Sequence, residues 1–193
     1  MNKAYFNTYC LTFLLASTLV GCSKQQVMSD KNHTPQMSEE FYDAAVFADM
    51  AKLKTMIEAD PSVVNSVDKW GFTALHGVAG EEHYDVVTFL VDRGANINAK
   101  NDEGIAPLHI AAWPKMVEML VSHGADVNIR NKTGATPLMI HAREPDRYDV
   151  LRALLRAGAD PTLSDDDGRT ALEIATEFGD TEYAQLLSIK PAE

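Results

Sequence analysis

Six histidines and one run of acids are the residues of this chain whose types could do chemistry. The histidines are His33, His76, His83, His109, His123 and His141, and no pair has metal-ligand spacing with cysteine or carboxylate support. No Gly-x-Ser-x-Gly elbow, phosphate-binding loop or Cys/His nucleophile arrangement is present. We therefore expect no catalysis, no metal, no other cofactor and no small-molecule substrate. A hydrolase that uses these histidines and acids is kept as the alternative from the enzyme class.

Three consecutive acids, Asp165, Asp166 and Asp167, suggest calcium binding as a further alternative. In a calcium loop of the form Asp-x-[Asp/Asn]-x-[Asp/Asn]-Gly, only Asp165 has a counterpart at useful spacing, and the distal glutamate is missing. We expect these acids to form an exposed hairpin tip instead.

The charge balance narrows the classes of partner. The 193 residues carry 17 Lys and Arg against 28 Asp and Glu, a formal charge of −11. This sign repels nucleic acid and gives no attraction to an anionic membrane surface. Two interpretations remain open: a partner protein with a basic surface, or acidity that only keeps the chain soluble.

The first residues have the pattern of a targeting segment. Leu11 to Val20 is an apolar run of ten residues, too short to cross a membrane as a permanent helix and suited to the core of a signal peptide. The tetrapeptide that ends in Cys22 (Leu-Val-Gly-Cys) resembles the bacterial lipobox. That resemblance implies a lipoprotein signal peptide at 1–21, a lipidated Cys22 and, from Ser23, an outer-membrane anchor facing the periplasm. A plain secretory signal with a chance cysteine is the alternative.

Residues 22–38 lack apolar periodicity and are predicted to be a flexible linker. After Ser38, a helix cap followed by acids, the chain repeats itself. An Asx-x-x-Gly turn recurs with glycines 33, 30 and 34 residues apart, at 71, 104, 134 and 168. Two residues after each glycine comes a segment such as Thr-Ala-Leu-His or Thr-Pro-Leu-Met, and Gly-Ala-Asn/Asp follows later in three of the units.

These motifs resemble the ankyrin repeat from about residue 39 to the end. The resemblance implies an all-α solenoid of about five helix pairs with β-hairpin or turn connections. The predicted units are 39–67 as the N-terminal cap, 68–100, 101–130, 131–164, and 165–193 as the C-terminal cap, together the domain 39–193. The resemblance to the ankyrin repeat also implies that His76 and His109, at the Thr-Pro-Leu-His position of the repeat, form internal hydrogen bonds.

Elementary chemistry accounts for the same pattern. Each Asx side chain closes a turn in which glycine takes a positive φ, and Thr-Pro starts a helix. Apolar pairs such as Val86-Val87 and Leu90-Val91 give one apolar face to a second helix, which Gly94 then ends. One unit cannot cover its own apolar face, so neighbouring units must stack.

Two units depart from this register. The third has lost three residues between Trp113 and Pro114, and the fourth has gained one residue within 143–147. Both changes fall in the turn between the two helices of a unit. Drift at a surface loop and an edge shaped for a particular partner both explain them.

The variable positions of the repeat are the candidates for partner binding, on the concave face that the family resemblance indicates. They are Trp70, Phe72, Glu103, Ile105, Trp113, Lys132, Arg143, Asp166, Asp167 and Arg169. We expect Trp70, Phe72 and Trp113 as anchors, and Glu103, Asp166 and Asp167 as steering charges. Alternatively, Trp70 packs on its own hairpin and Trp113 fills the space left by the lost residues.

Together these features predict a non-catalytic lipoprotein that binds another protein. The resemblance to small lipid-anchored ankyrin proteins implies an immunity protein that neutralises a toxin of type VI secretion, such as a phospholipase. An accessory to a periplasmic oxidative-stress enzyme such as catalase is the alternative within the binding class.

Overall fold

A computed structural model of the chain describes residues 37–144, 147–178 and 185, which belong to a compact unit spanning 34–193. The predicted signal peptide, Cys22 and most of the predicted linker lie outside the described residues, as do Pro145 and Asp146. In the part of the chain that is described, no helix is long and apolar enough to span a membrane.

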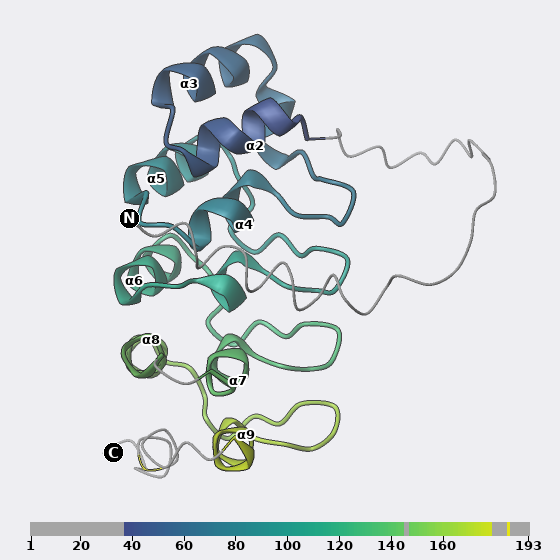
Figure 1. Cartoon of the computed structure of the whole chain (residues 1–193), viewed down its shortest axis with the longest axis vertical. Helices are drawn as coiled ribbons and strands as arrows, with labels where there is room; N and C mark the ends of the chain where they lie inside the picture. Colours follow the sequence, from purple (N-terminus) through teal and green to yellow (C-terminus); the bar gives the residue numbers. More distant parts are fainter. Residues whose placement is uncertain (1–36, 145–146, 179–184, 186–193) are drawn as a thin grey trace, which may run out of the picture. The chain divides into compact units, whose positions relative to one another are not determined.

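The described residues form a stack of paired helices. The first helices of the units are α2 (Glu39–Val46), α4 (Ala74–Ala79), the 3₁₀ turn η2 (Pro107–Ile110), α7 (Pro137–His141) and α9 (Ala171–Glu177). The second helices are α3 (Met50–Ala59), α5 (Tyr84–Asp92), α6 (Pro114–Ser122) and α8 (Tyr148–Arg156), and the short η1 (Pro61–Asn65) follows α3. Each set forms one column, and long loops project to one side of the first column (Figure 1). The predicted fold class, a helix-pair repeat solenoid, is confirmed.

The helices begin where the sequence places capping residues. The Ser38 hydroxyl accepts a hydrogen bond from the Phe41 N–H at the start of α2. At α9 the Thr170 hydroxyl accepts from the Glu173 N–H, and the Glu173 carboxylate accepts from the Thr170 N–H. This reciprocal capping box satisfies two backbone donors and fixes the helix start directly after a hairpin.

A continuous apolar core lies between the two columns and joins all the units. Its largest fully buried side chains are Phe41, Leu53, Leu75, Leu90, Leu108, Met116, Leu120, Leu138, Met139, Leu151 and Leu154. Gly77 lets α2 approach α4, because a Cβ at this position would lie 2.7 Å from the Tyr42 ring. The small residue is therefore needed for the contact between the first two units.

The third unit differs from its neighbours. Its first helix is reduced to the four residues of η2, whereas the other first helices have five to eight. Pro114 starts α6 directly, and the residue before a proline is driven into extended backbone; Trp113 accordingly has φ −130° and ψ 139°. The three lost residues have therefore shortened the first helix to a single 3₁₀ turn as well as removing part of the turn that follows it.

Asparagine side chains form hydrogen bonds between successive units on the side of the second helices. Asn65 donates to the Gly94 carbonyl at 2.8 Å and accepts from the Asn96 N–H at 2.8 Å. Asn98 makes the equivalent pair of bonds to Gly124 and Asp126. These residues hold the connections between units, which gives the hairpins a fixed spacing.

Candidate protein-binding surface

Four hairpins project from the first column, and each is closed by an Asx side chain. The Asp68 carboxylate accepts hydrogen bonds of 2.9 Å from the N–H groups of both Trp70 and Phe72. Asn101, Asn131 and Asp165 make the same two bonds in their own hairpins. The turn chemistry expected from Asx-x-x-Gly is thus present in all four.

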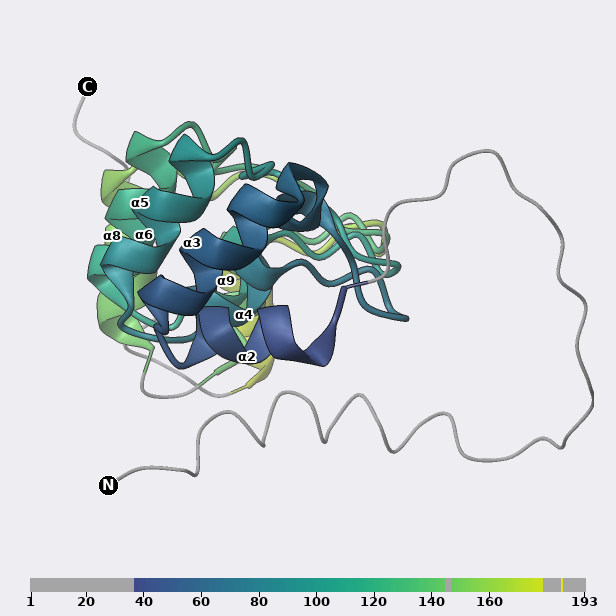
Figure 2. The same cartoon turned by 90° about the horizontal axis from the view of Figure 1, so that it is seen from above.

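The hairpin tips are also joined to one another by backbone hydrogen bonds. The Trp70 carbonyl accepts from Asp102 at 2.9 Å, the Glu103 carbonyl from Lys132 at 3.0 Å, and the Thr133 carbonyl from Asp166 at 3.0 Å. Seen from above, the loops superpose on the same side of the helices (Figure 2). The tip residues therefore form one continuous row on a fixed backbone, which we call the tip row.

Trp70 is the large exposed hydrophobic residue of the tip row. Its side chain is 44% exposed, and the Lys69 ammonium lies 4.0 Å from the centre of its ring. Packing within its own hairpin, the alternative considered above, is therefore partly correct, because a neighbouring lysine covers one ring face. Exposed Asp102 and Glu103 stand on the adjacent tip, so an aromatic surface and two carboxylates lie side by side.

Phe72 and Ile105 lie lower on the hairpins and are half-buried. The Phe72 ring meets His76 edge to face with ring centres 5.4 Å apart, and His76 Nε2 lies 2.9 Å from the Ile105 carbonyl oxygen. Ile110 and Ile140, both half-buried, share one repeat position six residues after the hairpin glycine, the position that Gly77 holds in α4. These isoleucines are not among the residues predicted from the variable positions, although their shared repeat position is a usable signal.

Asp165 and Arg169 are tied into the last hairpin. The Asp165 carboxylate is buried and accepts 2.9 Å and 3.2 Å bonds from the Arg169 guanidinium. Burial raises the pKa of Asp165, but the hydrogen bonds from Arg169 outweigh it and hold that pKa below its usual value. Only Asp166 and Asp167 form the exposed tip that we expected of all three acids.

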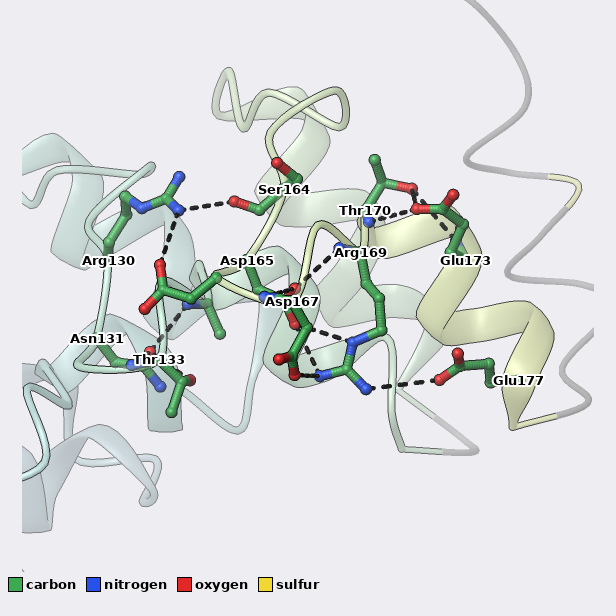
Figure 3. A network of polar contacts seen from close by, with 12 residues as sticks. Arg130, Asn131, Thr133, Ser164, Asp165, Asp167, Arg169, Thr170, Glu173 and Glu177 are labelled. Atoms are coloured by element: carbon green, nitrogen blue, oxygen red, sulfur yellow. Dashed lines mark hydrogen bonds and ion pairs between the residues drawn. The ribbon is translucent and has the colours of Figure 1, made fainter.

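These exposed acids already have partners within the chain. Arg169 also binds Asp167 at 3.0 Å, and Arg130 lies 3.7 Å from Asp166 while donating to the Ser164 carbonyl (Figure 3). A binding partner would have to compete with these arginines for the two carboxylates. Their steering role is therefore weaker than that of Asp102 and Glu103, which pair with no described cation.

Trp113 and Arg143 lie at the opposite end of the first helices from the tip row. Trp70 precedes α4, whereas the residue before Trp113, Ala112, donates its N–H to the Ala79 carbonyl at the last residue of α4. The six residues of α4 alone place the level of Trp70 about 9 Å from the level of Trp113. The structure therefore divides the predicted anchors between two edges and does not bring Trp70 and Trp113 together.

Two of the three buried histidines, His76 and His109, have structural partners. His76 Nδ1 accepts from the Thr73 N–H at 3.1 Å, and His109 Nδ1 accepts from the Ala106 N–H at 3.0 Å. Burial lowers the pKa of both rings to about 4, so both are neutral near pH 7. Within residues 37–144 and 147–178, no three His, Cys, Asp or Glu side chains are grouped to hold a metal ion.

The sequence comparisons agree with this geometry. The family described as ankyrin repeats (3 copies) matches residues 41–131 and 114–193. The chain belongs to the ankyrin-repeat family, whose repeats indicate a role in protein–protein interaction.

Three relatives show how widely this repeat is used. The chain is 39% identical over 154 residues to the E3 ubiquitin-protein ligase hecd-1 of Caenorhabditis elegans, which covers 80% of this chain and 5% of that protein. It is 32% identical over 120 residues to human BCL-6 corepressor-like protein 1, and the match covers 62% of this chain and 5% of that protein. To alpha-latrocrustotoxin-Lt1a of Latrodectus tredecimguttatus it is 34% identical over 83 residues, and the match covers 43% of this chain and 6% of that protein. The chain thus spans about a twentieth of each relative, so the similarity concerns the repeats.

Proposed function

We propose that this chain is a non-catalytic lipoprotein that binds and inhibits a partner protein in the bacterial periplasm. The observation that carries the binding role is the tip row, in which exposed Trp70 adjoins the carboxylates of Asp102 and Glu103. A large aromatic side chain on a fixed backbone contributes contact area with little loss of conformational entropy. The net charge of −11 favours a partner whose docking surface is basic.

The proposed location rests on residues 1–22. An apolar run of ten residues followed by Leu-Val-Gly-Cys supports export and lipidation at Cys22. Several acyl chains on one residue would anchor the protein stably, since each buried CH₂ contributes about 0.8 kcal/mol. We infer an immunity protein, which protects its own cell by neutralising a type VI secreted toxin such as a phospholipase, because inhibition needs only a rigid binding surface held where the toxin acts.

Deletion of the gene tests this function. We expect the deletion strain to be killed on contact with toxin-secreting sister cells and rescued by the intact gene. Rescue should fail with the double variant Trp70→Ala/Glu103→Gln and succeed with the control Glu58→Gln, an exposed residue of α3. Survival of the deletion strain would refute the immunity role.

The anchor is tested separately. Cys22→Ser should abolish incorporation of labelled palmitate and release the protein from the membrane fraction. Retention in that fraction with unchanged labelling would contradict the proposed lipidation site.

A further inference from the structure

Exposed aromatic residues gather at the junctions between first and second helices. Four large hydrophobic side chains of the described residues are exposed: Phe47 (74%), Trp70 (44%), Trp113 (41%) and Phe178 (62%). Trp70 lies in the tip row. Phe47 directly follows α2, Trp113 directly precedes α6, and Phe178 directly follows α9. We call the row of junctions at residues 47–49, 80–83 and 111–113 the turn edge; it lies at the end of the first helices away from the hairpins.

The backbone holds Trp113 in place at this edge. The Ala112 N–H donates to the Ala79 carbonyl of the second unit at 3.2 Å, and the Ala112 carbonyl accepts from Arg147 of the fourth unit at 2.8 Å. Pro114 follows and restricts the backbone further. The Trp113 indole therefore belongs to a segment that is hydrogen-bonded to the units on both sides of it, and its side chain remains 41% exposed. Simple filling of the space left by the lost residues would have buried it.

Phe47 is held by a turn that includes a strained residue. Ala48 has φ 57°, a left-handed conformation that costs a residue with a Cβ about 1–2 kcal/mol. The Phe47 N–H donates to the Asp43 carbonyl at 2.9 Å and the Asp49 N–H to the Ala44 carbonyl at 2.8 Å. Strain of this kind is often retained at functional sites.

Two glutamates occupy the junction between these aromatic residues. In stack order, Phe47 ends the first unit's helix, Glu81 and Glu82 follow α4, and Trp113 follows η2. No described lysine or arginine forms an ion pair with either glutamate, and the nearby Lys115 lies over the Tyr84 ring at 4.4 Å. Burial raises the pKa of half-buried Glu81, the adjacent His83 partly opposes this shift, and the neighbouring Glu82 adds to it. Its carboxylate therefore sits where a partner cation would interact more strongly than in open water.

We propose that the turn edge from Phe47 to Trp113 is a second docking surface, which binds a basic segment of a partner protein through arginine side chains. A guanidinium can donate two hydrogen bonds to a carboxylate and stack on an aromatic ring, and this edge alternates aromatic residue, acidic pair and aromatic residue. Two unit steps of 8–10 Å separate the aromatic residues by roughly 16–20 Å, a length that about six extended residues span. Because it lies on the other side of the first helices, this surface does not depend on the tip row.

A defined peptide tests the proposal on the full-length chain. The probe is a capped twelve-residue peptide of alternating arginine and leucine, and its control replaces each arginine with uncharged citrulline. Trp70→Phe leaves Trp113 as the reporter of emission, and Trp113→Phe leaves Trp70. We expect the arginine peptide to change the emission of Trp113 and leave that of Trp70 unchanged, and the citrulline peptide to change neither.

Matched charge variants separate docking from general attraction to an acidic protein. Glu81→Gln/Glu82→Gln should weaken peptide binding at least tenfold, whereas Glu58→Gln/Glu118→Gln, which removes two exposed charges from second helices, should weaken it less than twofold. Circular dichroism checks that each variant is folded. Equal losses for the two pairs, a response at Trp70 instead of Trp113, or no response up to millimolar peptide would each overturn the proposal. None of these outcomes refutes the tip row, whose test is cell survival; a response at Trp70 would instead add to its support.

Discussion

The guanidinium of Arg147 donates a 2.8 Å hydrogen bond to the carbonyl oxygen of Ala112, which lies 35 residues earlier in the chain. This bond joins the lengthened junction of the fourth unit to the shortened junction of the third. Arg147 also lies 3.7 Å from Glu144 of its own unit. The two irregular junctions are therefore coupled, because the arginine of one satisfies a carbonyl exposed by the other.

Replacing Arg147 with methionine should destabilise the fold by about 1.5–3 kcal/mol, since a charged hydrogen bond is lost while most of the apolar stem remains. Urea unfolding measures the change. Arg156→Met, at an exposed position of α8, is the matched control and should cost less than about 1 kcal/mol. In a Trp70→Phe background, Arg147→Met should also lower the fluorescence anisotropy of Trp113. Equal stability of the two variants would show that the bond does not fasten this segment.

The regular parts of the fold could be predicted from sequence because their causes are local. Ser38 and Thr170 cap helices, and Asp68 closes a hairpin, through contacts within four residues. The exposure of Phe47 could not be predicted in this way. The apolar pattern of residues 44–49 indicates a helix pair, but α2 ends at Val46, a left-handed turn follows at Ala48, and Phe47 at the C-cap between them is exposed.

The candidate surface was less predictable because it depends on distant contacts. The residues predicted from variable repeat positions are mostly exposed. However, the sequence pattern does not indicate that Trp70 and Trp113 lie at opposite ends of the first helices. The Arg169 interactions with Asp165 and Asp167 likewise need the folded hairpin. The conformation of the shortened segment around Trp113 depends on Pro114 and on a hydrogen bond from Arg147 of another unit to Ala112. A local sequence pattern does not encode that distant contact.

Three buried histidines should make the fold acid-sensitive. Burial lowers the pKa of His76 and His109 to about 4 and that of His141 to about 3, all below the ordinary 6.5. The unfolded chain therefore takes up protons below pH 6.5 while the folded chain does not, so stability is full above pH 6.5 and lost as pH falls. Each ring contributes about 1.4 kcal/mol per pH unit. Urea unfolding at pH 7.5 and 5.5 should differ by roughly 3–4 kcal/mol, and equal values would contradict this account.

His141 should be replaceable with a gain in stability. Neither of its ring nitrogens makes a hydrogen bond of good geometry among the described residues, although the ring is buried, and only the Leu108 backbone weakly opposes the lowering of its pKa. Because an unsatisfied buried polar group is costly, His141→Leu should stabilise the fold by about 1–2 kcal/mol at pH 7.5. The same variant should reduce the pH dependence by about a third. The control His123→Leu, at a partly exposed site, should not stabilise the fold; a destabilised His141→Leu protein would mean that the ring has a partner.

Substitutions at two glycines of the third unit separate the effect of the contact between hairpin tips from the effect of backbone strain. Gly104 and Gly124 both have positive φ, 74° and 94°, so alanine carries a similar backbone strain of about 1–2 kcal/mol at either position. A Cβ on Gly104 would lie 2.7 Å from the Lys132 backbone nitrogen, whereas a Cβ on Gly124 would meet nothing within 4 Å. Gly104→Ala should therefore cost about 1–3 kcal/mol more than Gly124→Ala in urea unfolding, because the next tip must move away. Hydrogen exchange at the Lys132 amide, which bonds to the Glu103 carbonyl, should accelerate only in Gly104→Ala. If the two variants lose the same stability and the amide stays protected, the tips are not held by mutual contact, and the tip row would have to be described as four independent loops.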